Sequence, residues 1–322
     1  MIKRTQNKVA ESRFTLPVVT AYAIAVWLAC GLLIPTIPLS GSMLLQGAWV
    51  QFVCFLLSAF LMVELNNGNA LIRIYSRMVS GSFIVMFCAA NILFSSITGA
   101  IVQLCVVASL ATFFNSYQDK QSMGWTFYTF LLIGLASTVF IQILFYVPIL
   151  WLMMLTQLTS LSWRTFWASL LGLLAPYWFI LPVAIYEENL WRFVNHFMEI
   201  ATFQLPDYSQ LTLNQVADFA FVVVMALTGC IHYWRNSLKD KFRTRQLYGC
   251  FIILAFFTIA FIAAQPQHYP ELMNILIIAT APLIAHFLAL THTRITNYAF
   301  YVVCSLALLL TLFNLWMPSL TF

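Results

Sequence analysis

The chain has 322 residues, of which 62% are hydrophobic and 8% are charged, and its formal net charge is +5. Soluble domains carry roughly 25% charged residues, so this composition excludes a water-soluble globular fold and requires most of the surface to face lipid. The small basic excess does not predict nucleic-acid binding, because basic residues in a membrane protein mainly set its orientation.

Apolar runs that could each form a membrane helix follow one another along the whole chain. They cover residues 14–34, 43–63, 80–95, 97–114, 124–138, 140–157, 164–185, 215–234, 246–264, 273–291 and 297–316. At ~20 residues per crossing, we predict an all-α polytopic transmembrane bundle of about eleven crossings (10–11). Residues 80–114 and 124–157 are too long for one straight crossing and short for two, so each is either a hairpin of short helices or a pair of broken ones. No soluble domain interrupts the runs, and residues 1–322 form one integral membrane domain.

The distribution of basic residues selects the parity of the crossings. With the N-terminus in the cytoplasm and eleven crossings, all but one of the 15 Lys and Arg residues lie on the cytoplasmic side. The densest group is the segment WRNSLKDKFRTRQ at 234–246, and a single crossing of residues 124–157 would move it outside. The positive-inside rule therefore selects eleven crossings, with the N-terminus in the cytoplasm and the C-terminus outside.

The predicted outer loop at residues 186–214 has helical periodicity in its first part, over 188–203. Its apolar stripe consists of Leu190, Phe193, Val194, Phe197 and Ala201, and its polar stripe of Glu188, Arg192, Asn195, His196 and Glu199. These spacings of three and four residues predict an amphipathic helix that lies flat on the outer, periplasmic surface of the membrane. Its apolar stripe is expected to face lipid or the bundle, and its polar stripe to face water. Thr212 and Gln215 have the spacing of a capping box for the next membrane helix.

Two adjacent glutamates, Glu187 and Glu188, mark the start of this segment in the stretch AIYEENLWRF. They are either a catalytic carboxylate pair or the corner at which a spanning helix becomes a surface helix. Acidic residues suit the positive end of the dipole at the N-terminus of a helix. Glu188 and Arg192 have i,i+4 spacing, which stabilises an exposed helix by only ~0.3–0.5 kcal/mol.

Motifs of common membrane chemistry are missing from the sequence. It contains no GxxxxGK[ST], no HExxH and no GxSxG, which disfavours a nucleotide-driven pump or a common serine hydrolase. The first outer loop, PTIPLSGS, has no acid of the kind that glycosyltransferases using lipid-linked sugars carry there. The seven cysteines lie inside apolar runs without any CxxC, so neither a disulfide framework nor a metal site is expected, and no cofactor is predicted.

Few polar side chains lie at membrane depth, where each is a functional hint because burial in hydrocarbon is costly. Asp218 lies one turn inside the run 215–234, near the outer surface, and His286 lies well inside 273–291. His286 is either a hydrogen-bonded packing residue or a proton relay. Neutral amides within the runs are expected to join helices at ~0.6 kcal/mol each; they are Gln51, Asn91, Gln103 and Gln142.

The outer face carries the candidate binding residues. Arg192 is the one cation predicted outside, and an arginine binds phosphate through two parallel hydrogen bonds. With His196 one turn along, it could hold a lipid phosphate or diphosphate. The complete candidate set is Arg192, His196, Glu188, Glu187 and Asp218. The sequence assigns no catalytic residue.

Two stretches carry a family resemblance: ELNNGNALIRIYSR at 64–77 and LTQLTSLSWRTFWASLLGLLAPYWFI at 155–180. In order and setting the chain resembles an uncharacterised family of multi-pass inner-membrane proteins from Bacteroidota. The resemblance implies location and fold but no activity. In its many crossings and its outer helix with arginine and histidine, the chain also resembles polymerases and ligases of envelope glycans.

Three hypotheses of function follow, and they leave open whether the protein is an enzyme. The first is a role in envelope lipid or glycan handling, with a lipid-linked phosphate recognised near Arg192. The second is a secondary transporter with its site among the short helices of 80–157. The third is a non-catalytic scaffold or complex subunit that assembles protein partners in the membrane. In each of them the lipid bilayer is a partner and nucleic acid is not.

Overall fold

The computed structural model describes residues 4–33, 42–186, 190–201 and 206–316, and all regular secondary structure among them is helical. The α-helices are α1 (Thr5–Glu11), α2 (Thr15–Leu33), α3 (Ser42–Asn69), α4 (Met78–Ala89), α5 (Ile97–Phe113), α6 (Met123–Ser137), α7 (Tyr146–Thr156), α8 (Trp163–Tyr186), α9 (Leu190–Met198), α10 (Leu213–Asn236), α11 (Phe242–Ala264), α12 (Tyr269–Leu290) and α13 (Arg294–Trp316). Short 3₁₀ helices are η1 (Asn91–Ser95), η2 (Phe114–Ser116), η3 (Ile141–Phe145), η4 (Tyr208–Gln210), η5 (Ser237–Lys239) and η6 (Pro266–His268). The all-α prediction is confirmed for the described residues.

A helix lies in each of the eleven predicted apolar runs. Among the described residues, 7 helices are long and apolar enough to cross a membrane, and the pair α1 and α2, bent by 90°, raises this to up to 8. The other apolar helices are α4, α6 and the η3–α7 segment, which are shorter. The fold therefore fits a multi-pass membrane protein, while the eleven crossings and their orientation stay predictions.

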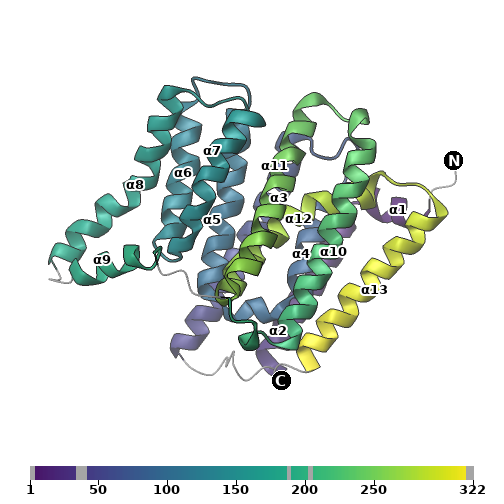
Figure 1. Cartoon of the computed structure of the whole chain (residues 1–322). Coiled ribbons are helices and arrows are strands. Elements are labelled where there is room, and N and C mark those ends of the chain that lie inside the picture. The colour runs from purple at the N-terminus through teal and green to yellow at the C-terminus, as the bar shows by residue number, and fades with distance from the viewer. Residues whose placement is uncertain (1–3, 34–41, 187–189, 202–205, 317–322) are drawn as a thin grey trace.

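The helix ends that carry the basic residues meet at one end of the bundle, which we call the basic end. Arg243 donates to Asn69 Oδ1 at 2.9 Å, and this bond joins the start of α11 to the end of α3. The hydroxyl of Ser162 donates to the carbonyl of Lys120 at 2.8 Å, which joins the α5–α6 and α7–α8 connections. In Figure 1 these connections lie at the top, with the α10–α11 connection. The basic residues at this end are Arg4, Lys8, Arg13, Arg73, Arg77, Lys120, Arg164, Arg235, Lys239, Lys241, Arg243, Arg245 and Arg294.

The core of the bundle surrounds α12, whose side chains are buried on nearly all sides. Its neighbours are α4, α5, α10 and α11. A Cβ added at Gly229 of α10 would lie 2.6 Å from the carbonyl carbon of Leu283 in α12, so the two backbones touch. Small residues allow this close approach, which matters because helices in lipid associate through packing and polar contacts.

Two glycines hold α8 against α6 and so fix one wall of the site described below. A Cβ on Gly172 of α8 would collide with the carbonyl oxygen of Phe127 in α6. A Cβ on Gly134 of α6 would lie 2.7 Å from the carbonyl oxygen of Leu173. The far side of α8 has large exposed apolar side chains, including Trp178 at 78% exposure, as expected of a surface that faces lipid.

Residues 80–114 and 124–157, which are too long for one straight crossing and short for two, each contain two separate α-helices. After α4 the chain passes through η1 before α5 begins, and after α6 it passes through residues 138–140 and η3 before α7 begins. Both connections lie at the bottom in Figure 1, away from the basic end. Each segment is thus interrupted by a 3₁₀ helix, and near the second interruption the end of α6 contacts α9.

Candidate functional site

The short helix α9 forms one wall of the site. Sequence periodicity predicted a helix over 188–203, and the structure contains α-helix over Leu190–Met198. The following residues form tight turns, in which the N–H of Ile200 donates to the carbonyl of Phe197 at 3.2 Å and that of Ala201 to Met198 at 3.0 Å. Such i→i−3 bonds commonly end an α-helix, because its last carbonyls lack α-helical partners. The predicted helix is therefore confirmed over Leu190–Met198 and too long at its C-terminal end, while residues 188, 189, 202 and 203 lie outside the described residues.

The two faces of α9 only partly follow the predicted stripes. Phe193 and Phe197 pack on Tyr177 of α8, with ring centroids 6.1 Å and 4.9 Å apart, as expected of an apolar face toward the bundle. Val194, assigned to the same stripe, is 42% exposed. His196 belongs to the predicted polar stripe, and yet its Nε2 lies 2.9 Å from the carbonyl oxygen of Ser137. The prediction that this face meets only water is wrong at His196.

The contact between His196 and Ser137 has a simple physical cause. Ser137 is the last residue of α6, where backbone carbonyls have no helical partner and require another donor. A carbonyl only accepts hydrogen bonds, so Nε2 of His196 carries the proton and donates. In a neutral imidazole the other nitrogen, Nδ1, is then an acceptor.

Ser137 also binds α8. Its hydroxyl lies 2.7 Å from the phenol oxygen of Tyr177, and its side chain is fully buried. One residue at the end of α6 thus holds a ring from α8 through its side chain and a ring from α9 through its carbonyl. Sequence inspection singled out neither Ser137 nor Tyr177, because each lies in an apolar run and gives no local signal.

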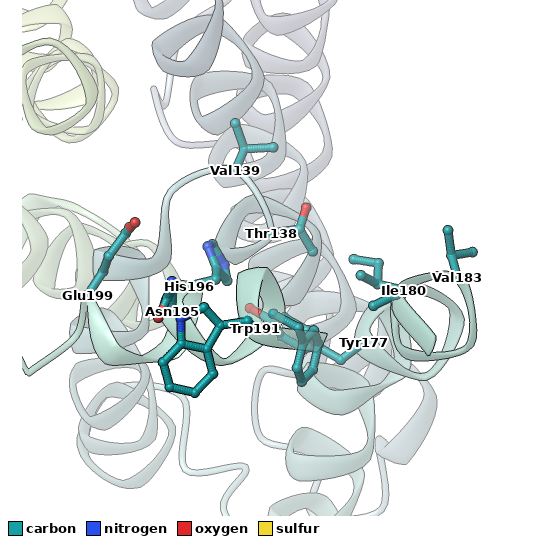
Figure 2. A pocket seen from close by; sticks show the side chains of 11 residues that line it. Thr138, Val139, Tyr177, Ile180, Val183, Trp191, Asn195, His196 and Glu199 are labelled. Atoms are coloured by element: carbon teal, nitrogen blue, oxygen red, sulfur yellow. The ribbon is translucent and has the colours of Figure 1, made fainter. Parts of the chain in front are cut away.

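A cavity of about 660 Å³ lies between the end of α6, α8 and α9. Its polar lining residues are Thr138, Tyr177, Asn195, His196 and Glu199, and its apolar lining residues are Val139, Ile180, Val183, Ala184, Trp191 and Phe193. Figure 2 shows Trp191, Asn195 and His196 from α9 on one side, and Tyr177, Ile180 and Val183 from α8 on the other. The cavity therefore offers hydrogen-bonding groups beside an apolar wall.

The structure brings only part of the predicted binding set together. His196 lines the cavity. Arg192 belongs to α9 by its backbone, but its side chain lies outside the description, and Glu187 and Glu188 lie outside the described residues. Asp218 does not line the cavity: it is buried in α10, where its Oδ1 accepts a hydrogen bond of 2.8 Å from Asn314.

A second polar cluster lies at the basic end. Nε2 of His286 donates to Oδ2 of Asp240 at 2.9 Å, and both side chains are at most 2% exposed. Arg73 lies 3.7 Å from the other carboxylate oxygen, and the ring of His232 lies 5.3 Å from that of His286. Of the two interpretations of His286, a hydrogen-bonded packing residue agrees with this geometry. Asp240 was missed, because its position in a charged loop gives no sign that it is buried against α12.

Over the described residues the structure is all-helical, with seven helices that could span a membrane, and this fits a multi-pass membrane protein. No protein-family model matches the chain, and no curated protein or solved structure matches it either. The resemblance to an uncharacterised Bacteroidota family therefore stays a prediction. The function is accordingly inferred from the geometry of the cavity and of the buried polar groups.

Proposed function

We propose that this protein binds a membrane amphiphile in the cavity between α6, α8 and α9, and that it acts in cell-envelope lipid or glycan handling in the bacterial inner membrane. The observation that carries the proposal is a cavity of about 660 Å³ that is lined by polar groups on one side and apolar groups on the other, next to the exposed apolar surface of α8. Small-molecule sites typically measure roughly 300–1,000 Å³ and combine an apolar wall with a few polar groups that orient the ligand.

The polar wall suits a headgroup that carries hydroxyls and a phosphate. The amide of Asn195, the hydroxyl of Thr138 and the carboxylate of Glu199 can bind sugar or glycerol hydroxyls. Arg192, in α9 one turn before His196, is the residue that we expect to bind the phosphate, because a guanidinium holds phosphate through paired charge-assisted bonds.

The apolar wall suits the acyl or prenyl part. Ile180 and Val183 of α8 line the cavity and are 38% and 54% exposed, so the wall continues onto the surface of α8 that faces lipid. Trp191 is 70% exposed, and tryptophan concentrates at the level of the lipid headgroups. A lipid could therefore place its headgroup in the cavity while its chain stays along α8.

The basic end of the bundle indicates how the protein is oriented in the membrane. The positive-inside rule favours a cytoplasmic position for that end, and we therefore propose that the cavity, which lies near the opposite end, opens at the outer face.

Filling the cavity tests the proposal. Ala184→Trp introduces an indole at a lining position, and we expect it to remove most of the co-purified phosphate-bearing amphiphile, as measured by lipid extraction and mass spectrometry of the purified protein. Leu174→Trp is the matched control on α8, since Leu174 is 59% exposed and does not line the cavity. Equal lipid content in both variants and in the unmodified protein would contradict the proposal.

The scaffold hypothesis has one observation in its favour. A groove of about 410 Å³ between α10 and α13 is lined by apolar side chains only, among them Phe221, Val224 and Leu306. A partner helix or a lipid tail would fit such a groove. The transporter hypothesis draws support from the buried polar groups at the α4–η1 break, which are described next.

A further inference from the structure

Asp218 is a carboxylate buried inside the bundle, away from the basic end. It is 1% exposed, its Oδ1 accepts a bond from Asn314, and its Oδ2 has no hydrogen-bond partner among the described residues. It forms no ion pair with any described Lys, Arg or His. An uncompensated carboxylate is among the most costly groups to bury in an apolar interior, so Asp218 requires either a proton or a bound cation.

Two buried asparagines join the α4–η1 break to α13, and one of them also contacts Asp218. Asn314 Nδ2 donates to the carbonyl of Ala89 at 2.8 Å as well as to Asp218, and Asn91 Nδ2 donates to the carbonyl of Thr311 at 3.1 Å. Carbonyl oxygens only accept, so these bonds fix the orientation of both amides. The Oδ1 atoms of Asn91 and Asn314 are thereby left without partners, and both side chains are fully buried.

The unpartnered atoms in this group are all oxygens. They are Asp218 Oδ2, Asn91 Oδ1 and Asn314 Oδ1. The nearby phenol of Tyr269 cannot supply the missing donor to Asp218, because its hydroxyl donates to the carbonyl of Gln215 at 2.9 Å.

The helix α4 ends at this point. Ala89 is its last residue, Ala90 leaves the α-helical conformation at φ −89° and ψ 51°, and η1 starts at Asn91. The last carbonyls of a helix carry partial negative charge. Interrupted membrane helices whose carbonyls and C-terminal ends face inward bind cations such as sodium in secondary transporters.

We infer that Asp218, Asn91 and Asn314 bind a monovalent hard cation, of the sodium class, between α4, α10 and α13. One carboxylate with neutral amide oxygens balances a single positive charge, whereas calcium sites commonly draw on several carboxylates. The described residues contain no group of three or more His, Cys, Asp or Glu that could hold a transition metal. The site is separate from the cavity at α9 and stands independently of the proposed lipid binding.

Binding of radioactive sodium to the full chain in lipid nanodiscs tests the inference, with choline chloride keeping the ionic strength constant. The unmodified protein should bind sodium saturably and release it to unlabelled sodium. Asp218→Asn keeps the shape of the side chain and should weaken binding by about tenfold or more, since it removes a charged contact. Glu271→Gln is the corresponding acid-to-amide change in α12, at a carboxylate that accepts a hydrogen bond from Ser96, and this variant should bind sodium like the unmodified protein.

Three results would overturn the inference. One is the absence of saturable sodium binding, and another is sodium binding that Asp218→Asn leaves unchanged. The third is stability that responds to pH but not to sodium and loses this response in Asp218→Asn, which would mean that the carboxyl is simply protonated. Should Asp218→Asn fail to fold, Asn91→Ala replaces it and should also weaken sodium binding, because it removes one oxygen ligand.

Discussion

Asp240→Ala is expected to lower the free energy of unfolding by about 1.5–3 kcal/mol, the cost of removing a charged acceptor from a buried hydrogen bond. The change would leave His286 without its 2.9 Å acceptor inside α12 and would free Arg73 from its 3.7 Å contact. It would thereby detach the α10–α11 connection from the core. Equilibrium unfolding in mixed detergent micelles would measure the loss.

Asp119→Ala is the matched control at the same end of the bundle. Asp119 is exposed, and its carboxylate accepts one bond of 2.8 Å from the N–H of Gln121. Losing such a surface contact should cost below about 1 kcal/mol. A similar cost for the two variants would show that the Asp240–His286 pair contributes little to the stability of the fold.

The second large effect is expected at Arg192. Arg192→Ala should lower the affinity for a phosphate-bearing lipid by roughly ten- to a hundred-fold, which corresponds to a charge-assisted hydrogen bond of ~1.5–3 kcal/mol. Arg192→Lys keeps the charge without the planar fork and should recover only part of that affinity. Native mass spectrometry with a short-chain phosphatidic acid, compared with the matching diacylglycerol, would measure both changes.

Glu188→Gln separates the two interpretations of the glutamates at the start of the surface helix. If Glu188 only pairs with Arg192, the change should cost a few tenths of a kcal/mol in stability and leave lipid binding intact. If Glu188→Gln instead abolished the activity of the protein in cells while the fold stayed intact, the carboxylate would be assigned a role in acid–base chemistry. An unaltered lipid affinity in Arg192→Ala would contradict phosphate recognition at this residue.

The helices themselves could be predicted from composition and periodicity. A membrane helix needs a long apolar run, so each run was visible as a local pattern, and the amphipathic period of α9 was equally local. Boundaries were less predictable: α9 ends at Met198 because turns close over the next residues, which no spacing of side chains indicates.

The contacts of the candidate sites could not be predicted in the same way. His196 was found because it is polar on an amphipathic helix, but its partner is a backbone carbonyl of Ser137, which has no sequence signature. Asp240 lies in a charged loop and pairs with His286 only through tertiary packing. Asp218 was noticed as an acid inside an apolar run, but its partner Asn314 comes from a helix far along the chain, and Asn91 contacts that same helix.

Photocross-linking from Val183 tests most directly whether a phosphate-bearing amphiphile occupies the cavity. A benzophenone amino acid would be placed at Val183, which lines the cavity, or at Leu174, which lies on the same helix outside it. Cells grown with radioactive phosphate would then be irradiated and the protein purified. Lipid binding in the cavity predicts a phosphate-labelled adduct at Val183 and far less at Leu174. Equal labelling at both positions, or none at Val183, would contradict it.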